Sequence, residues 1–497
     1  MIIKEFYDVV IVGTSLAPLT AGALLSRRGL RVLVVGNGEL EDDSLLALFN
    51  TITSPLVTRI FEELGVTHMV RRKLRRSEPL FQVILPGARI DVGTDREAYE
   101  KEIDREFGHV AEDIKLLDTM LPEMMDGMEK VIQGEYFLPP DGLIEKKRID
   151  ILLRGTPFGG KAEEFEYYEK VVSDPAYECF LRAVAASNLY LEHKDLARGG
   201  FLFLYKRMTG NCAVFEGGPR ALKKILYDKI DSYGGEVRSS ESIEEVSLKG
   251  RKVTTIRLAG KDSLIGCDFL LSGVESECLE AMLTQEGRSL KEDILKSEDM
   301  TPTGFFITTH VKVKKQVIPE AMAQNIIAVF DCGRRLRESN YLWAEIEDGG
   351  ERGKKDVRRI ALHYILDRKS LMASPAYSKD VLKAIITNLG TVIPFLEDFI
   401  VECVDPVERI MKSHFTEDPV LHLSRLMPSI YEFHGETAGP FIGLGHKTGI
   451  KNAYRVGGEV CPSLGEDGLW LAALGAARII ASQRKGKTRL RRRIMFT

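Results

Sequence analysis

The sequence lacks the short spacings that mark metal sites and disulfide frameworks. Its seven cysteines form no CxxC pair, and its nine histidines form no HExxH motif. We therefore expect no zinc site. An odd and dispersed set of cysteines is typical of reduced thiols in the core of a cytosolic protein. The seven are Cys179, Cys212, Cys267, Cys278, Cys332, Cys403 and Cys461.

The sequence also has little that would direct it into a membrane or onto nucleic acid. It contains no run of about 18 apolar residues, so we expect no transmembrane helix. Residues 1–25 are small and apolar, as in a signal peptide, but Glu5 and Asp8 oppose a basic n-region and Gly13 interrupts the apolar run. We interpret them as folded structure in a cytosolic chain. The 69 basic and 73 acidic residues leave a net charge of −4, which does not indicate a nucleic-acid partner.

What is present indicates a globular protein of more than one domain. The chain has 497 residues, of which 44% are hydrophobic and 29% charged. This balance excludes disorder as the main state and excludes collagen-like composition. The length exceeds one ordinary hydrophobic core, so we expect two or three domains.

The first 35 residues have the pattern of a βαβ unit. Residues 8–12 are a short, almost wholly apolar run, as in a strand buried on both faces of a parallel sheet. A tight turn follows at Gly13, Thr14 and Ser15, and residues 16–28 have helical spacing. Residues 31–35 form a second apolar strand. A right-handed crossover joins two parallel strands of this kind.

A glycine turn between such a strand and helix can hold a pyrophosphate, because its backbone N–H groups and the helix dipole both favour an anion. The usual spacing is GxGxxG, with an acidic residue about 20 positions later for a ribose. Here Ser15 occupies the second glycine position and Pro18 the third. Gly36 stands where the acid is expected, and Asn37 or Glu39 could substitute. The motif alone leaves open an ordinary α/β unit that binds nothing.

Two later blocks repeat the alternation of glycine turns, helices and strands. Gly217, Gly218 and Pro219 precede a predicted helix at residues 220–233. Strands are predicted at residues 236–237, 242–248, 252–258 and 268–272. Residues 448–483 predict a strand, a glycine-rich turn and a helix.

The remaining segments predict a second sheet with helices. Residues 81–92 alternate as strands around a turn, residues 95–132 and 377–400 have helical patterns, and residues 133–165 are rich in proline and glycine, which indicates an irregular segment. An antiparallel sheet is predicted from residues 303–315, 325–331, 340–346 and 357–365, with residues 347–352 as a solvated turn.

The order of these blocks resembles the FAD-dependent amine oxidase and phytoene desaturase superfamily. The second glycine block resembles the family's second cofactor segment, and residues 452–459 with Pro462 to Gly465 and Gly468 resemble its closing flavin motif. Asp405 and Pro406 resemble the segment that precedes that motif. The resemblance is closest to the phytoene desaturase, carotenoid isomerase and retinol saturase branch, and the same fold serves flavin-free Rab GDP-dissociation inhibitors and escort proteins.

The resemblance implies FAD as the cofactor and assigns a part to particular residues. The pyrophosphate would lie on Gly13, Thr14, Ser15 and Leu16, the ribose beside Gly36 and Asn37, and the adenine against the backbone of Val246. The flavin side would be formed by Gly457, Gly458, Glu459, Gly468 and Leu469. Gly458 stands where the family has the aspartate of its ribityl contact, and Glu459 comes one place late. No residue is assigned a catalytic part, since the histidines are dispersed.

The implied architecture is an α/β fold with a Rossmann-like FAD-binding domain of the GDP-dissociation-inhibitor and amine-oxidase type. We expect that domain at residues 1–75, 205–285 and 440–483. A mixed α+β substrate domain would take residues 76–204 and 286–439. Residues 484–497 would form a separate basic tail.

The implied function is flavin-dependent desaturation, saturation or isomerisation of a hydrophobic polyene or isoprenoid. The first alternative is a flavin-free escort that binds a prenyl lipid or a prenylated partner, and the second is an amine oxidase. The tail carries seven basic residues and no acid. We expect it to bind an anionic surface at the inner face of a membrane, and Arg71 to Arg76 could add to that patch. A solvated arm is the alternative for the tail.

Overall fold

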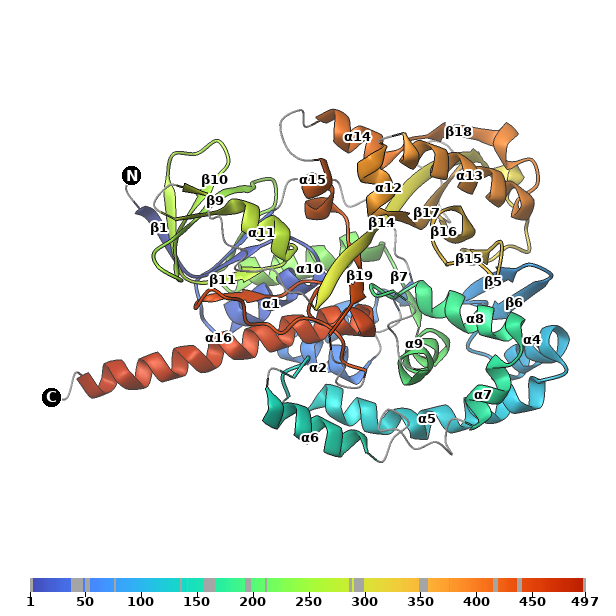
Figure 1. Cartoon of the computed structure of the whole chain (residues 1–497), viewed down its shortest axis with the longest axis horizontal. Coiled ribbons are helices and arrows are strands. Elements are labelled where there is room, and N and C mark those ends of the chain that lie inside the picture. The colour runs from blue at the N-terminus through green and yellow to red at the C-terminus, as the bar shows by residue number, and fades with distance from the viewer. Residues whose placement is uncertain are drawn as a thin grey trace.

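A computed structural model gives the architecture (Figure 1). It describes residues 3–36, 48–49, 54–75, 77–134, 136–140, 142–154, 166–192, 198–210, 212–285, 288–289, 299–347, 356–374, 376–413, 419–435 and 440–494. Within these ranges no helix is long and apolar enough to cross a membrane.

The first sheet contains the parallel strands predicted from the N-terminal block. Its strands are β1 (Ile3–Val12), β2 (Val32–Val35), β8 (Glu236–Arg238), β9 (Ile243–Leu248), β10 (Val253–Leu258), β11 (Leu264–Ser272), β12 (Leu283–Gln285), β13 (Arg288–Ser289) and β20 (Ala453–Arg455). Within the described ranges their order is β13-β12-β9-β10-β11-β1-β2-β8, and β20 pairs with β11. β1 is parallel to both β2 and β11, and β20 is parallel to β11. The carboxyl ends of β1, β2, β11 and β20 therefore meet at one edge.

Helices α1 (Leu16–Arg27), α10 (Gly218–Ser232) and α16 (Glu466–Ile494) pack together on this sheet. α1 approaches closely because Gly22 has no side chain: a Cβ there would lie 3.1 Å from a methyl group of Val34. Every residue of β2 is buried, as its continuous apolar run predicted.

The second sheet carries most of the antiparallel pairing. Its strands are β5 (Phe81–Leu85), β6 (Ala88–Val92), β14 (Met300–Lys314), β15 (Asn325–Val329), β16 (Tyr341–Ile346), β17 (Val357–Asp367), β18 (Ile400–Cys403) and β19 (Ser429–Phe433). Their order is β18-β14-β17-β16-β15-β5-β6 over the described residues, with β19 paired to β14. The pairing of β15 with β5 is parallel. Side chains of α12 (Arg368–Ala373), α13 (Tyr377–Val392), α14 (Pro406–Ser413) and α15 (Pro419–Leu426) share a core with this sheet.

A helical layer connects the two sheets. It contains α2 (Pro55–Leu64), α3 (Thr67–Arg71), α4 (Arg96–Phe107), α5 (Ala111–Gln133), α6 (Leu143–Leu153), α7 (Glu166–Val172), α8 (Pro175–Ala186) and α9 (Arg198–Gly210). A small sheet of β3 (Leu48–Phe49), β4 (Leu74–Arg75) and β7 (Ala213–Phe215) lies beside it. The remaining short helix, α11 (Ser276–Met282), follows β11.

The structure corrects four expectations. Residues 133–165 contain helix α6, because a regular helix lies between the prolines and glycines that suggested an irregular segment. The helix predicted over residues 377–400 ends at Val392, and a 3-10 turn and β18 follow it. α16 continues to Ile494, so the backbone of most of the expected tail is helical. The turn expected at residues 347–352 lies almost wholly outside the described residues.

The fourth correction concerns the cysteines. Cys179 of α8 and Cys332, which follows β15, form a disulfide, although we expected reduced thiols throughout. The two residues are 153 positions apart, with Cα atoms 5.5 Å apart. The pairing depends on α8 packing against β5 and β15, a long-range contact that cysteine spacing does not reveal.

Candidate functional site

Three glycines converge where the carboxyl ends of the parallel strands meet. Gly13 follows β1 with a φ of +100° and donates to the carbonyl of Val35 at 2.8 Å. Gly273 follows β11, and Gly457 follows β20 so closely that a Cβ on it would lie 3.0 Å from the carbonyl oxygen of Gly273. Ligands of open α/β sheets bind at such an edge. The structure thus brings the first and last predicted segments together.

The N-terminus of α1 opens at this edge. Ser15 is the N-cap residue, is exposed, and makes no capping hydrogen bond with its hydroxyl. Thr14 and Leu16 beside it are half-buried, and the first turn of α1 contains no acidic residue. Pro18 packs against Gly273, where a Cβ would overlap its ring. The backbone N–H groups and the helix dipole at this turn therefore fit an anion such as a pyrophosphate.

Position 36 does not fit the ribose contact of the motif. The N–H of Gly36 donates to the carbonyl of Arg238 at 3.0 Å, which extends the pairing of β2 with β8. A Cβ at Gly36 would overlap the carbonyl oxygen of Ser239. This end of β2 is closed by backbone, so no acidic side chain could point from it. Asn37, the other residue expected near a ribose, lies outside the described residues.

Val246 is not at the open edge, contrary to our expectation. It lies within β9, opposite Ile256 of β10 on one side and Leu283 of β12 on the other. Its side chain is fully buried. With neighbouring strands on both sides, its backbone is not available for an adenine. The sequence pattern located the strand but not its place in the sheet.

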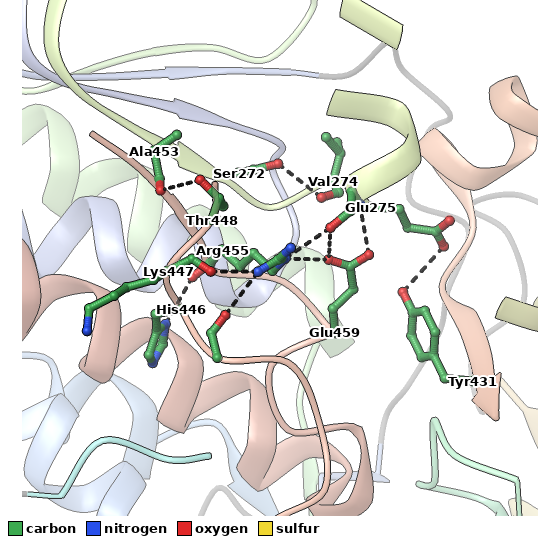
Figure 2. A network of polar contacts seen from close by, with 12 residues as sticks. Ser272, Val274, Glu275, Tyr431, His446, Lys447, Thr448, Ala453, Arg455 and Glu459 are labelled. Carbon is green, nitrogen blue, oxygen red and sulfur yellow. Dashed lines mark hydrogen bonds and ion pairs between the residues drawn. The ribbon is translucent and has the colours of Figure 1, made fainter. Parts of the chain in front are cut away.

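The carboxylate of Glu459, in the loop after β20, already forms hydrogen bonds with other residues of the protein. Glu459 accepts hydrogen bonds from the backbone N–H of Ser276 at 2.8 Å and from its hydroxyl at 2.7 Å (Figure 2). The Nε of Arg455 lies 3.4 Å from the same carboxylate. Burial raises the pKa of Glu459, and the positive charge of Arg455 opposes this rise. Glu459 thus fixes the start of α11, while Gly458 faces open space, with nothing within 4 Å of a Cβ placed there.

The remaining predicted residues of the flavin side lie at the start of α16. Gly468 is buried, and a Cβ on it would overlap the carbonyl oxygen of Cys461. Leu469 is half-buried. The preceding Gly465 packs on Asn188, whose side-chain oxygen accepts from the N–H of Glu466 at 3.1 Å. The helix start is therefore held against residues 188–192, whose backbone forms hydrogen bonds with Tyr431 of β19.

Glu275 was not among the predicted site residues. It follows Gly273 at the carboxyl end of β11 and is 8% exposed. The hydroxyl of Tyr431, on β19 of the other sheet, donates to its Oε1 at 3.5 Å (Figure 2). Arg368 lies 3.7 Å from its Oε2, which makes no hydrogen bond.

Burial raises the pKa of Glu275 to about 8. Glu459 and Glu277 raise the pKa further, whereas Ser429 and Arg368 oppose them. The carboxyl group can therefore hold a proton at neutral pH, where the two sheets meet. Its position directly after a buried parallel strand was the only sequence signal that could have singled it out.

A second buried group of charges anchors α16. The Nε of Arg207, on α9, donates to Asp467 at 2.7 Å, and its Nη1 lies 2.5 Å from Glu129 on α5. Asp467 is fully buried, and this burial raises its pKa to about 6 against the lowering effect of Arg207. The group therefore joins the helices α5, α9 and α16.

Comparisons with known proteins show the fold. No protein-family profile and no curated protein sequence matches the chain. Among solved structures, an oxidoreductase from Methanosarcina mazei is 12% identical with a TM-score of 0.54, over 95% of this chain and 99% of that one. A triple mutant of putrescine oxidase is 13% identical with a TM-score of 0.55, over 97% and 99%. Cyclohexylamine oxidase from Brevibacterium oxydans is 12% identical with a TM-score of 0.51, over 96% and 99%.

These likenesses span nearly the whole of each chain and confirm the predicted fold class. The chain has the α/β fold of the amine-oxidase type, with a Rossmann-like domain. At identities of 12–13%, the likeness carries the fold and no activity.

Proposed function

We propose that the chain is an FAD-dependent oxidoreductase that acts on a hydrophobic polyene or isoprenoid-type molecule, as a desaturase, saturase or isomerase. The observation that carries the proposal is the N-terminus of α1: Ser15 is exposed, its hydroxyl makes no cap bond, and no acid stands in the first turn. An anionic cofactor is the group that such a turn favours at a sheet edge. The similar structures, two oxidases and an oxidoreductase, support redox chemistry.

The chain would hold FAD mainly through backbone. Thr14 and Ser15 would present N–H groups to the pyrophosphate, the turn at Gly13 would let the backbone approach it, and the open space at Gly458 would admit the ribityl chain. When bound, the flavin supplies the hydride transfer, and the protein supplies orientation and exclusion of water. Glu275 and Tyr431 would hold a proton where the two sheets meet, and a substrate bound on the side of the second sheet would approach them there.

A flavin-free escort for a prenyl lipid or a prenylated partner is the second candidate. Two observations favour it: backbone closes the end of β2 at Gly36, and the carboxylate of Glu459 is hydrogen-bonded to Ser276. Both remove polar contacts that a flavin nucleotide would use. Amine oxidation is a third possibility. Putrescine oxidase and cyclohexylamine oxidase, which share the fold, favour it, but a shared fold does not determine the substrate.

The test is the visible spectrum of the full chain, recorded after addition of FAD and desalting. We expect the wild-type chain to retain a flavin spectrum and Ser15→Glu to lose it by charge repulsion. Ser482→Glu, at an exposed position on α16, adds the same charge away from the turn and should retain flavin. A wild-type chain that stays colourless would contradict the proposal and favour the escort.

Substrate class is tested on the flavin-loaded chain without oxygen. Bleaching of the flavin by a polyene precursor, or reoxidation of reduced flavin by an unsaturated polyene, supports the proposal. Bleaching by an alkylamine alone would contradict the polyene proposal and support amine oxidation as the function.

A further inference from the structure

Helix α6 exposes large aliphatic side chains to solvent. Leu143 is 83% exposed, Ile144 73%, Ile151 60% and Leu152 42%. The opposite side of the helix is buried through Ile149 and Leu153 and holds α6 to the protein. The exposed side is thus apolar without being needed for the attachment of the helix. A cluster of this kind on a soluble protein marks an interaction surface.

The exposed side also carries cations in a regular arrangement. Residues four apart lie above one another on a helix, so Leu143, Lys147 and Ile151 form one row. Ile144, Arg148 and Leu152 form the neighbouring row. Lys147 and Arg148 are both exposed, so each row has a cation between two aliphatic side chains.

Acidic side chains are missing from this face. The two acids of α6, Glu145 and Asp150, are only half-exposed and lie outside the two rows. Arg154, directly after the helix, adds another exposed cation. The exposed residues of the face therefore carry a net positive charge, which fits an anionic surface and opposes a second copy of the same face.

A cleft opens at the N-terminal end of α6. Its volume is about 590 Å³, and on this side it is lined by Phe137, Leu143, Ile144 and the acidic Glu145. Lys447 and Ile479 line the other side, and Ile479 belongs to α16. α6 and α16 therefore border one cleft, and α16 leads on to the basic residues 484–494 (Figure 1).

We propose that the exposed face of α6, formed by Leu143, Ile144, Lys147, Arg148, Ile151 and Leu152, docks on an anionic lipid bilayer. The aliphatic side chains enter the boundary between headgroups and acyl chains, and the cations remain among the headgroups. A helix of 11 residues is too short to span a bilayer and lies in the plane of the interface. This docking does not depend on bound FAD, and it is distinct from binding through the basic tail.

Co-sedimentation of the full chain with vesicles tests the docking. We expect binding to vesicles of phosphatidylcholine with phosphatidylserine, and weak binding to phosphatidylcholine alone. The double variant Ile144→Glu/Ile151→Glu should bind roughly tenfold more weakly, because it removes two inserting side chains and adds two like charges. The control is Leu116→Glu on α5, where the side chain is 41% exposed, and this variant should bind as the wild type.

Insertion is measured separately with Ile151→Trp. Lipids brominated in their acyl chains should quench the fluorescence of this variant beyond that of the wild type, whose Trp343 and Trp470 are buried. Leu116→Trp should gain no quenching. A double variant that binds vesicles as tightly as the wild type, or an Ile151→Trp variant without added quenching, would overturn the proposal. So would a dimer that the double variant dissociates in the absence of any lipid binding.

Discussion

The carbonyl oxygen of Ser239 occupies the space into which a side chain at Gly36 would extend. Pairing of β2 with β8 brings the two residues together, since the N–H of Gly36 also bonds the carbonyl of Arg238. An acidic residue introduced at position 36 would therefore not restore the ribose contact. The backbone around β8 has closed over the position.

The first prediction follows from this closure. Gly36→Ala should lower the free energy of unfolding by about 3 kcal/mol or more, because the Cβ must displace backbone rather than a flexible side chain. Gly36→Glu should be at least as destabilising and should not improve FAD binding. Urea denaturation measures the first effect and flavin titration the second. A stable Gly36→Glu variant that binds FAD more tightly would show that the end of β2 is open in solution.

Gly458 offers the opposite case. Nothing lies within 4 Å of a Cβ at this position, and its φ is not in the left-handed region. Gly458→Asp should leave stability unchanged and strengthen FAD binding by roughly tenfold, as expected for one added hydrogen bond to a charged group. Gly390→Asp, on α13 and also facing open space, is the matched control and should leave FAD affinity unchanged. Equal FAD affinities for both variants and the wild type would contradict a ribityl contact at Gly458.

Local sequence signals predicted the elements around the site better than they predicted the site. The strand, turn and helix at residues 8–28 are determined by neighbouring residues, and β1, Gly13 and α1 lie where expected. Val246 was misplaced because strand order in the sheet is set by distant pairing. Glu275 was missed because its burial depends on Tyr431, 156 positions away. Likewise, the exposed side of α6 is recognisable only once its buried side is known.

Stability should depend on pH through Glu275. Its pKa is raised to about 8 in the folded chain, chiefly by burial, and is near 4.5 in the unfolded chain. The folded state therefore binds the extra proton between these values. Its contribution is fully present below pH 4.5 and is lost as the pH rises through about 8.

Glu275→Gln tests this dependence, because an amide keeps the size and cannot ionise. The variant should gain melting temperature relative to the wild type at pH 9 and differ little at pH 5. The comparison isolates Glu275, since Glu459, Arg368, Glu277 and Tyr431 face it in both proteins. A melting-temperature difference that is the same at both pH values would show that Glu275 is already ionised or solvated.

The buried charges behind α16 predict a large cost for one substitution. Arg207→Met should lower the free energy of unfolding by about 3–5 kcal/mol, because the fully buried Asp467 and the half-buried Glu129 would be left without a cation. Arg96→Met removes an exposed pair with Glu100 and should leave the free energy of unfolding nearly unchanged.

The cost of Arg207→Met should also grow with pH. The pKa of Asp467 is raised to about 6 even beside Arg207, and removal of the cation raises it further. At pH 5 Asp467 is protonated in the variant, which reduces the loss of stability. At pH 8 the carboxylate must either stay buried without a cation or become exposed by opening of the helix start. Urea denaturation at the two pH values measures the difference. A smaller cost at pH 8 than at pH 5 would mean that Asp467 does not depend on Arg207 for its charge.

Deletion of the basic segment at the end of α16 separates its contribution to vesicle binding from that of α6. Residues 484–497 carry seven cations and no acid, and attraction to an anionic surface is worth about 1 kcal/mol for each cation near it. A chain that ends at Gln483 should therefore lose most of its binding to phosphatidylserine vesicles, and the loss should shrink at high salt because the attraction is screened. Binding by α6 includes an apolar contribution that salt does not weaken. The deleted chain should thus keep a weak, salt-resistant binding that Ile144→Glu/Ile151→Glu then removes. Unchanged binding after the deletion would refute the tail as an anchor while leaving the face of α6 to account for the attachment.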